Sequence, residues 1–138
     1  MRTMFTLVTG APCSGKSSYV EKMRGERDLV IDLDLLQCAL GSKRTHGHAK
    51  ERLSFALAMR NAVLKELQGY SSPPPVWYIS CWPTAEELSS FPGNVYRVQM
   101  PTAIDECKRR ADASKRPPET IALIEEWFDL HGQVGTIS

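Results

Sequence analysis

Apolar runs alternate with amphipathic stretches along this chain, and the alternation predicts strands and helices that follow one another. Short apolar runs rich in β-branched and aromatic residues predict strands at 4–9, within 28–36, at 76–80 and at 94–100. Apolar residues at helical spacing predict helices that end at Gly25 and Gly41, and others at 52–68, from Thr84 onward, at 102–113 and at 118–131. Strands that alternate with helices pair in parallel, so the sequence predicts a three-layer α/β fold with a short parallel sheet of four strands.

Two helix starts and the tail carry finer signals. Thr84 and Glu87 have the spacing of a capping box, in which two side chains satisfy the first free N–H groups of a helix. Thr102, with Asp105 three residues later, predicts a second start of this kind. The tail VGTIS, at 134–138, would add a fifth strand if it pairs with the sheet edge.

Length, net charge and cysteine spacing restrict the class of protein to which this chain can belong. A chain of 138 residues with a net charge of +1 is ordinary for one globular domain, and we expect a single domain over 1–138. Such a charge argues against a surface coated with basic residues for nonspecific nucleic-acid binding. The cysteines follow no disulfide or metal-binding spacing, and no apolar run approaches the length of a membrane span or secretory signal. We therefore expect a cytoplasmic protein that does not enter a membrane.

Positive charge is nevertheless concentrated in two segments of the chain. The basic residues are Lys43, Arg44, Lys50 and Arg52 in the first segment and Lys108, Arg109, Arg110, Lys115 and Arg116 in the second. Both segments are candidates to line one phosphate-binding cleft, because clustered cations attract polyphosphates.

The segment GAPCSGKSS follows the first predicted strand and opens a predicted helix. Its spacing of Gly10, Gly15, Lys16 and Ser17 is the phosphate-loop pattern. Glycines let backbone amides converge on phosphate oxygens at the positive end of a helix, the lysine binds the outer phosphates, and the serine hydroxyl binds Mg²⁺. The sequence therefore predicts a site for ATP and Mg²⁺, formed by Gly10, Ala11, Pro12, Cys13, Ser14, Gly15, Lys16, Ser17 and Ser18.

Cys13 and the pair His46 and His48 are weaker candidates for chemistry. The helix dipole and Lys16 would lower the pKa of the Cys13 thiol, but a small packed residue is the simpler interpretation. The two histidines, spaced by one glycine, have the chemistry of metal ligands, yet a third ligand at suitable spacing is missing from the neighbouring sequence. We therefore favour a solvated loop there.

Two carboxylates stand at the carboxyl end of the second predicted strand, in IDLD at 31–34. The phosphate loop opens at the same sheet edge, and residues at i and i+2 point the same way if the strand continues through them. Asp32 would then hold Mg²⁺ while Asp34 accepts the proton of an attacking hydroxyl, as a kinase requires. The alternative is that Asp34 caps the short helix that follows, although capping leaves Asp32 unexplained.

The third predicted strand lacks an acid at its end. Switch and motor ATPases usually place an acidic residue there to position Mg²⁺ and water. Here VWYIS is followed by Cys81 and Trp82, so the acid comes from the second strand instead. Trp82 is either a stacking surface for a base or part of the rim of the core.

The phosphate loop, IDLD and the basic segment CKRRADASKRPP at 107–118 resemble the motifs of the small P-loop kinases. The likeness is greatest to the phage branch of polynucleotide-kinase-like, AAA-type ATP-binding proteins, and it covers nearly the whole chain. This resemblance implies the P-loop NTPase fold. It also implies that Asp34 activates the acceptor hydroxyl and that Arg110 and Arg116, on a mobile lid, clamp the phosphates. Relatives that act on polynucleotide ends usually carry further polar residues after the third strand, where this chain has Cys81 and Trp82.

The expected lid spans 108–118. Phosphoryl transfer needs positive charge around the moving group and exclusion of water, and a cationic segment hinged by prolines can close to provide both. Pro117 and Pro118 predict a break at that place. The alternative is an ordinary charged helix end, because the helix dipole favours basic residues near a C-terminus.

Arg60 falls at the middle of the apolar face of the predicted helix 52–68. Arginine is rarely buried without a partner, so we hypothesise that Arg60 reaches Asp32, Asp34 or a substrate phosphate. The alternative is a side chain that extends along the helix edge into solvent.

Together these observations predict a kinase that uses ATP and Mg²⁺ and phosphorylates a hydroxyl of a nucleotide, a nucleoside, a nucleic-acid end or another small molecule. The predicted catalytic residues are Lys16, Asp34, Arg110 and Arg116, and the predicted metal ligands are Ser17 and Asp32. Two alternatives stay open: an ATPase that hydrolyses ATP in support of phage DNA processing, and a nucleotide-binding module with little turnover.

Overall fold

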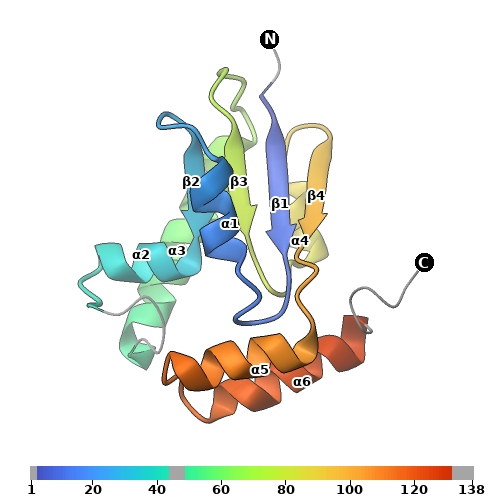
Figure 1. Ribbon diagram of the computed structural model, residues 1–138. Helices are drawn as coiled ribbons and strands as arrows, with labels where there is room; N and C mark the ends of the chain where they lie inside the picture. Colours follow the sequence, from blue (N-terminus) through green and yellow to red (C-terminus); the bar gives the residue numbers. More distant parts are fainter. Residues whose placement is uncertain (1–2, 44–48, 132–138) are drawn as a thin grey trace.

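A four-stranded sheet forms the centre of the molecule in the computed structural model, which describes residues 3–43 and 49–131 (Figure 1). The strands are β1 (Phe5–Thr9), β2 (Leu29–Asp32), β3 (Val76–Ile79) and β4 (Val95–Gln99). Their order across the sheet is β2-β3-β1-β4, and each of the three strand pairs is parallel. The four predicted strands are confirmed. The proposed fifth strand at 134–138 and the pair His46 and His48 lie outside the described residues.

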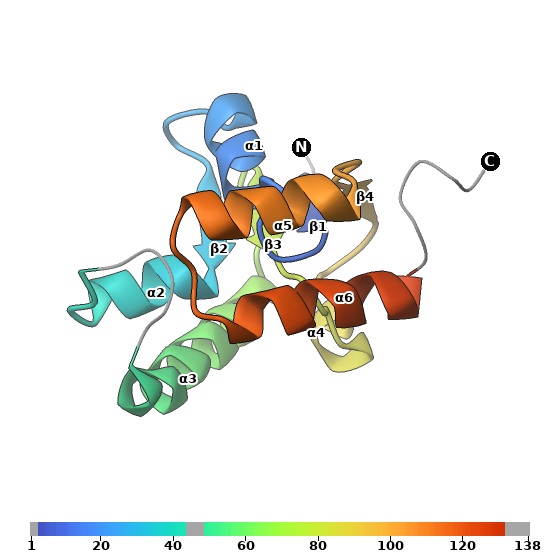
Figure 2. The same ribbon diagram turned by 60° about the horizontal axis from the view of Figure 1, so that its bottom comes forward.

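Helices lie on both faces of the sheet and across the carboxyl ends of its strands. They are α1 (Lys16–Met23), α2 (Leu33–Ala39), α3 (Lys50–Leu67), α4 (Ala85–Ser89), α5 (Ile104–Ala113) and α6 (Glu119–His131). Figure 1 shows α1 in front of the sheet, with α3 and α4 behind it, and Figure 2 shows α5 and α6 side by side beyond the strand ends. The predicted α/β fold is confirmed. Within the described ranges, every helix is too short or too polar to cross a bilayer.

Neighbouring side chains of the strands enter two separate cores. On the α1 side, Val8 packs with Val20 of that helix. On the opposite side, Leu7 and Tyr78 pack with Leu64 of α3. Because both faces of β1 and β3 are covered, the carboxyl ends of these strands are held firmly where the phosphate loop begins.

A third apolar cluster connects the phosphate loop to the last two helices. Ala11 of the loop is buried together with Cys107 and Ala111 of α5 and with Ile124 and Trp127 of α6. The loop therefore rests on a packed pair of helices, and the backbone around it is supported from below as well as from the sheet.

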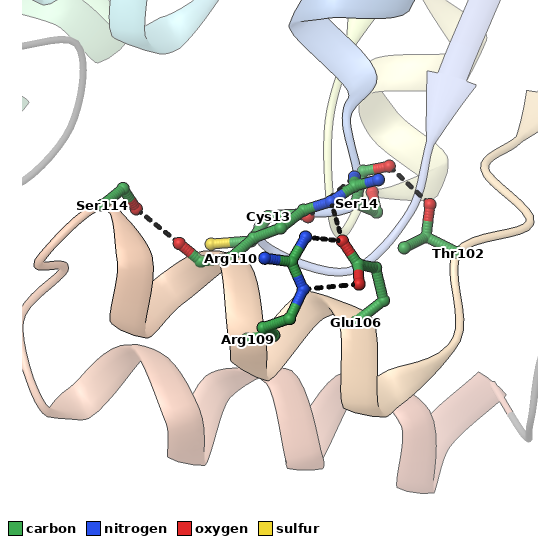
Figure 3. Close-up of polar contacts among 7 residues, drawn as sticks. All are labelled: Cys13, Ser14, Thr102, Glu106, Arg109, Arg110 and Ser114. Atoms are coloured by element: carbon green, nitrogen blue, oxygen red, sulfur yellow. Dashed lines mark hydrogen bonds and ion pairs between the residues drawn. The ribbon is translucent and has the colours of Figure 1, made fainter.

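Of the two predicted caps, one is confirmed and one is wrong. At the start of α4, Thr84 Oγ1 accepts a hydrogen bond from the Glu87 N–H at 3.1 Å, and the Glu87 side chain bonds back to the Thr84 N–H at 3.4 Å. The N-cap of α5 is Ala103, which makes no side-chain cap bond. The Thr102 hydroxyl instead donates to the carbonyl oxygen of Ser14 at 2.7 Å, so a tertiary contact with the phosphate loop takes the place of the local one (Figure 3).

Candidate active site

The segment between β1 and α1 has backbone geometry that requires its glycines. Gly15, the N-cap of α1, has φ 94°, and a Cβ atom there would lie 3.2 Å from Arg110 Nη1. At Gly10 a Cβ atom would lie 2.4 Å from Ser14 Oγ, closer than such atoms approach one another. The loop therefore brings backbone directly against its neighbours and presents amide groups rather than side chains at the start of α1, which is the arrangement of an anion-binding cradle.

The Lys16 side chain folds back over this loop. Its Nζ donates hydrogen bonds to the carbonyl oxygens of Gly10 at 3.1 Å and of Ala11 at 2.8 Å. An ammonium fixed against the loop adds positive charge to the end of the helix where the amide groups gather. The structure thus brings the predicted phosphate-binding groups together in one place.

Ser17 and Asp32 meet across the cleft between α1 and the end of β2. The Ser17 hydroxyl donates to Asp32 Oδ2 at 2.9 Å, and Asp32 Oδ1 accepts from the Asp34 N–H at 3.1 Å. Burial raises the pKa of the Asp32 carboxyl, as does the charge of Asp34, while the hydrogen bond from Ser17 opposes the rise. One carboxylate oxygen of Asp32 therefore bonds to α1 and the other to α2, and these two bonds fix the direction of the carboxylate.

The predicted arrangement of the two aspartates requires a correction. β2 ends at Asp32, and Asp34 lies in the first turn of α2, so the two side chains do not share one face of a strand. Asp32, not Asp34, is the residue that caps α2. The physical reason is local: the Asp32 side chain satisfies a free N–H group at the helix start, so the strand ends at Asp32 and does not continue to Asp34.

A cleft of about 920 Å³ opens at the carboxyl ends of the strands, and it collects the candidate residues. Its lining includes the residues of the phosphate loop from Pro12 onward, residues of β2, α2, α3, β3, α4 and α5, and residues of the connections that follow β3, β4 and α5. The predicted site residues among them are Pro12, Cys13, Ser14, Gly15, Lys16, Ser17, Ser18, Asp32, Asp34, Arg60, Arg110 and Arg116.

Ser17 and Asp32 provide two oxygen ligands, which suits Mg²⁺ better than a metal that takes all of its ligands from protein side chains. No group of three or more His, Cys, Asp or Glu side chains that could hold a metal occurs in 3–43 or 49–131. A magnesium ion at a phosphate-binding site takes one or two protein oxygens and fills its remaining positions with phosphate oxygens and water. A hydroxyl and a carboxylate beside the loop provide such oxygens.

Arg110 extends from α5 to the phosphate loop (Figure 3). Its Nε donates to Glu106 Oε2 at 2.8 Å and its Nη1 donates to the Cys13 carbonyl oxygen at 3.4 Å. Glu106 also accepts two hydrogen bonds from Arg109, and these together with Arg110 lower the pKa of the Glu106 carboxyl to about 2. Glu106 therefore stays ionised and orients the Arg110 guanidinium toward the loop.

Arg116 follows the end of α5 and also lines the cleft. Its backbone N–H donates to the Ala111 carbonyl oxygen at 3.0 Å, which turns the chain toward α6. Its Nε is buried and has no hydrogen-bond partner in the described part of the chain. Both arginines of the predicted lid therefore reach the cleft, and closure of the segment 108–118 remains a prediction.

Cys13 has the environment of a packed residue. It contacts the cluster formed by α5 and α6, and burial raises the pKa of its thiol although Arg116 and Lys16 act in the opposite direction. A raised pKa keeps the thiol protonated, which favours the packing interpretation over an activated nucleophile.

Arg60 has a different partner from those predicted. Its Nη1 lies 3.9 Å from Glu87 Oε2, and its side chain is 21% exposed. The expected contact with Asp32 or Asp34 is therefore replaced by an ion pair with α4. Part of the expectation holds, because the Arg60 side chain is mostly buried and lines the cleft.

Trp82 lies at the rim of the cleft with 37% of its surface exposed. The preceding residue, Cys81, is held by Trp127 of α6, whose Nε1 donates to the Cys81 carbonyl oxygen at 2.9 Å. The segment after β3 is thus anchored to the same helix pair that supports the phosphate loop. Stacking of Trp82 on a base remains a prediction.

Comparison with solved structures identifies the fold. The chain is similar to a candidate kinase from Chloroflexus aurantiacus, with a TM-score of 0.57 and 12% identity over 97% of this chain and 79% of that one. It is also similar to a shikimate kinase from Acinetobacter baumannii in complex with shikimate, with a TM-score of 0.58 and 16% identity over 94% of this chain and 77% of that one. The chain has a P-loop kinase-like fold. Neither a protein-family model nor a curated protein matches the sequence.

Three further residues belong to this site that the sequence patterns do not predict there: Tyr78, Glu87 and Glu106. The Tyr78 hydroxyl donates to Glu87 Oε2 inside the protein, and burial and the Glu87 charge raise the pKa of the phenol. The sequence predicts Glu87 only as a capping residue, whereas in the structure it also lines the cleft. A tyrosine in a buried strand is a usable signal, because its hydroxyl needs a partner. The spacing of Glu106 from Arg109 and Arg110 is also visible in the sequence as helix pairs.

Proposed function

We propose that this protein is a kinase that transfers the γ-phosphoryl group of ATP to a hydroxyl group of a small molecule, a nucleotide or a nucleic-acid end. The observation that carries the proposal is the position of Asp34. Asp34 lies two residues after Asp32, which bonds to Ser17, and it lines the same cleft as the phosphate loop. A carboxylate that lines this cleft can accept the proton of a hydroxyl that enters beside the terminal phosphate.

The phosphate side of the cleft has the groups that ATP binding requires. The amides at the start of α1 and the Lys16 ammonium bind phosphate oxygens, and Gly10 and Gly15 allow the close approach. Ser17 and Asp32 would hold Mg²⁺, which neutralises charge on the β- and γ-phosphates when it is bound. The fixed direction of the Asp32 carboxylate suits this role.

The acceptor side provides the proton transfer and the remaining charge. Asp34 accepts the proton of the attacking hydroxyl, a step that a positioned carboxylate can accelerate by about 10²- to 10⁴-fold. Arg110 and Arg116 balance negative charge on the transferring group, and closure of 108–118 would exclude water. Glu106 keeps Arg110 directed at the loop.

The comparisons support the choice of a kinase and of a small acceptor. Both structural neighbours are described as kinases, one of them a candidate, and the other holds shikimate, a small molecule with hydroxyl groups. The end of β3 adds a second argument, since Ser80, Cys81 and Trp82 provide no acid of the kind that hydrolytic P-loop enzymes place there.

Incubation with γ-labelled ATP, Mg²⁺ and a panel of acceptors tests the proposal. The panel contains nucleosides, nucleotides, a DNA oligomer with a free 5′-hydroxyl, and shikimate. We expect label to move to at least one acceptor. Release of free phosphate alone would identify an ATPase, and binding of ATP with neither outcome would identify a nucleotide-binding module.

A further inference from the structure

One wall of the cleft is formed by three residues from separate elements: Arg60 of α3, Tyr78 of β3 and Glu87 of α4. Tyr78 pairs in register with Ile31 of the neighbouring strand β2. Since β2 leads directly into Asp32 and then Asp34, this wall lies beside the acceptor half of the cleft rather than beneath the phosphate loop.

Glu87 satisfies its carboxylate without Arg60. Its Oε1 accepts hydrogen bonds from the Thr84 hydroxyl at 3.2 Å and from the Thr84 N–H at 3.4 Å, and its Oε2 accepts from the Tyr78 hydroxyl. Burial keeps the Tyr78 phenol protonated and able to donate, because its pKa is raised. Three donors therefore satisfy the two oxygens of this buried carboxyl group.

Arg60 is in the opposite situation. Its Nη1 lies 3.9 Å from Glu87 Oε2, which is too far for a hydrogen bond, and its Nε is buried with no hydrogen-bond partner among the described residues. Leaving donors of a charged group unsatisfied is unfavourable, and a guanidinium offers its donors as a fork that matches carboxylate and phosphate groups. The Arg60 side chain that carries this fork is among those that line the cleft.

We infer that Arg60 binds an oxyanion, a carboxylate or a phosphate monoester, carried by the phosphoryl acceptor, and that Glu87 competes with this oxyanion for the guanidinium. The inference rests on the proposed function. It narrows the acceptor to hydroxyl compounds that carry a second, negatively charged group. Uncharged nucleosides and sugars would leave the Arg60 donors without an acceptor. The buried Glu87 carboxylate would weaken the binding of any anion at Arg60, because like charges repel.

The competition predicts variant effects of opposite sign. Arg60→Ala should weaken oxyanion binding roughly tenfold or more, because it removes the charged donors. Glu87→Gln should strengthen binding several-fold, because glutamine preserves the capping box and a bond to the Tyr78 hydroxyl but removes the competing charge. Lys65→Ala, on the exposed surface of the same helix, is the matched control for loss of one positive charge and should change nothing.

Side-chain NMR of the arginine Nε–H groups tests binding without any phosphoryl transfer. Protein saturated with Mg²⁺ and a non-hydrolysable ATP analogue is titrated separately with inorganic phosphate and with acetate. We expect the Arg60 Nε–H resonance, assigned by its loss in Arg60→Ala, to shift and saturate with at least one of the two anions. The anion that gives the tighter binding identifies the acceptor group as phosphate or carboxylate.

The same titration is repeated on Lys16→Ala without nucleotide, so that a failure of anion binding at Arg60 can be distinguished from a failure of ATP binding. That variant weakens the phosphate loop, so anion binding at Arg60 is measured even if ATP does not bind. An Arg60 resonance that stays unmoved at high millimolar anion, or equal anion affinity in the native protein and in Arg60→Ala, would overturn the inference. Arg60→Lys guards against a folding artefact, because it keeps the charge and should retain part of the affinity. Weaker binding in Glu87→Gln would overturn the competition with Glu87.

Discussion

The two halves of the cleft are built on different principles. The phosphate half is made of backbone and of side chains close together in sequence: Lys16 bonds to the carbonyl oxygens of Gly10 and Ala11, and Ser17 bonds to Asp32 only fifteen positions away. The acceptor half depends on side chains from α3, β3 and α4, which meet only in the folded protein.

This difference separates phosphate binding, which the fold provides, from acceptor recognition, which depends on the side chains of the individual protein. A cradle of amides binds phosphate in any chain that forms the loop, so its chemistry is common to the fold. Side chains such as Arg60 and Glu87 are not dictated by the fold, and under the proposed function they would determine which acceptor enters. Variants in the two halves should therefore affect ATP binding and acceptor use independently.

The largest effect is expected for Asp34→Asn. Removal of the proton acceptor should lower phosphoryl transfer by about 10²- to 10⁴-fold, while ATP affinity stays nearly unchanged because the phosphate half is intact. Transfer is measured with labelled ATP and affinity by calorimetry. Asp129→Asn, at an exposed position of α6, controls for loss of one negative charge. Transfer by Asp34→Asn at the native rate would show that Asp34 is not the base.

Lys16→Ala should produce the next largest effect and change ATP binding itself. Loss of the ammonium removes charge-assisted hydrogen bonds worth about 1.5–3 kcal/mol each, so affinity should fall roughly 10- to 100-fold. Calorimetry with Mg²⁺ and ATP measures the change, and Lys65→Ala is the control. Unchanged ATP affinity would mean that the phosphate loop is not the nucleotide site.

Trp127→Phe should affect acceptor binding more than ATP binding, although Trp127 is not among the residues that line the cleft. The change removes the hydrogen bond to the Cys81 carbonyl oxygen and leaves that oxygen without its partner, which should lower the free energy of unfolding by about 1–3 kcal/mol. Phenylalanine keeps an aromatic ring in the cluster that contains Ala11 of the phosphate loop, whereas the lost bond holds Cys81, which precedes Trp82 at the rim of the cleft. The KM for the acceptor should therefore rise more than the KM for ATP. Urea denaturation and steady-state kinetics measure the two effects. An equal rise in both KM values would contradict the division of the cleft.

Glu106→Gln should have the smallest effect, since Glu106 only orients Arg110. We expect a change of a few-fold in kcat, with acceptor KM unaffected. Folding lowers the pKa of Glu106 from 4.5 to about 2, so the folded protein holds the ionised form more strongly than the unfolded chain does. The stability from Glu106 is therefore fully present above pH 4.5 and is lost as the pH falls toward 2. The difference in thermal midpoint between the native protein and Glu106→Gln should shrink over that range, and a constant difference would rule out this role for the ionised carboxyl.

Much of the fold and the phosphate half could be predicted because their signals are local. The apolar runs identified all four strands, and the spacing of Gly10, Gly15, Lys16 and Ser17 placed the loop between a strand and a helix. The capping box at Thr84 is also local and is confirmed. Thr102 carried the same kind of signal, but its hydroxyl bonds to Ser14 instead, because a distant partner came within reach.

The sequence by itself determined the parallel α/β fold and the phosphate loop, because backbone angles, apolar periodicity and the charge of a nearby lysine act within a few residues of one another. Only the tertiary structure decided that Arg60 faces Glu87, that the Thr102 hydroxyl bonds to Ser14, and that Arg110 reaches the Cys13 carbonyl oxygen of the loop. Contacts of that kind depend on where helices pack relative to the sheet, and no short stretch of sequence contains both partners.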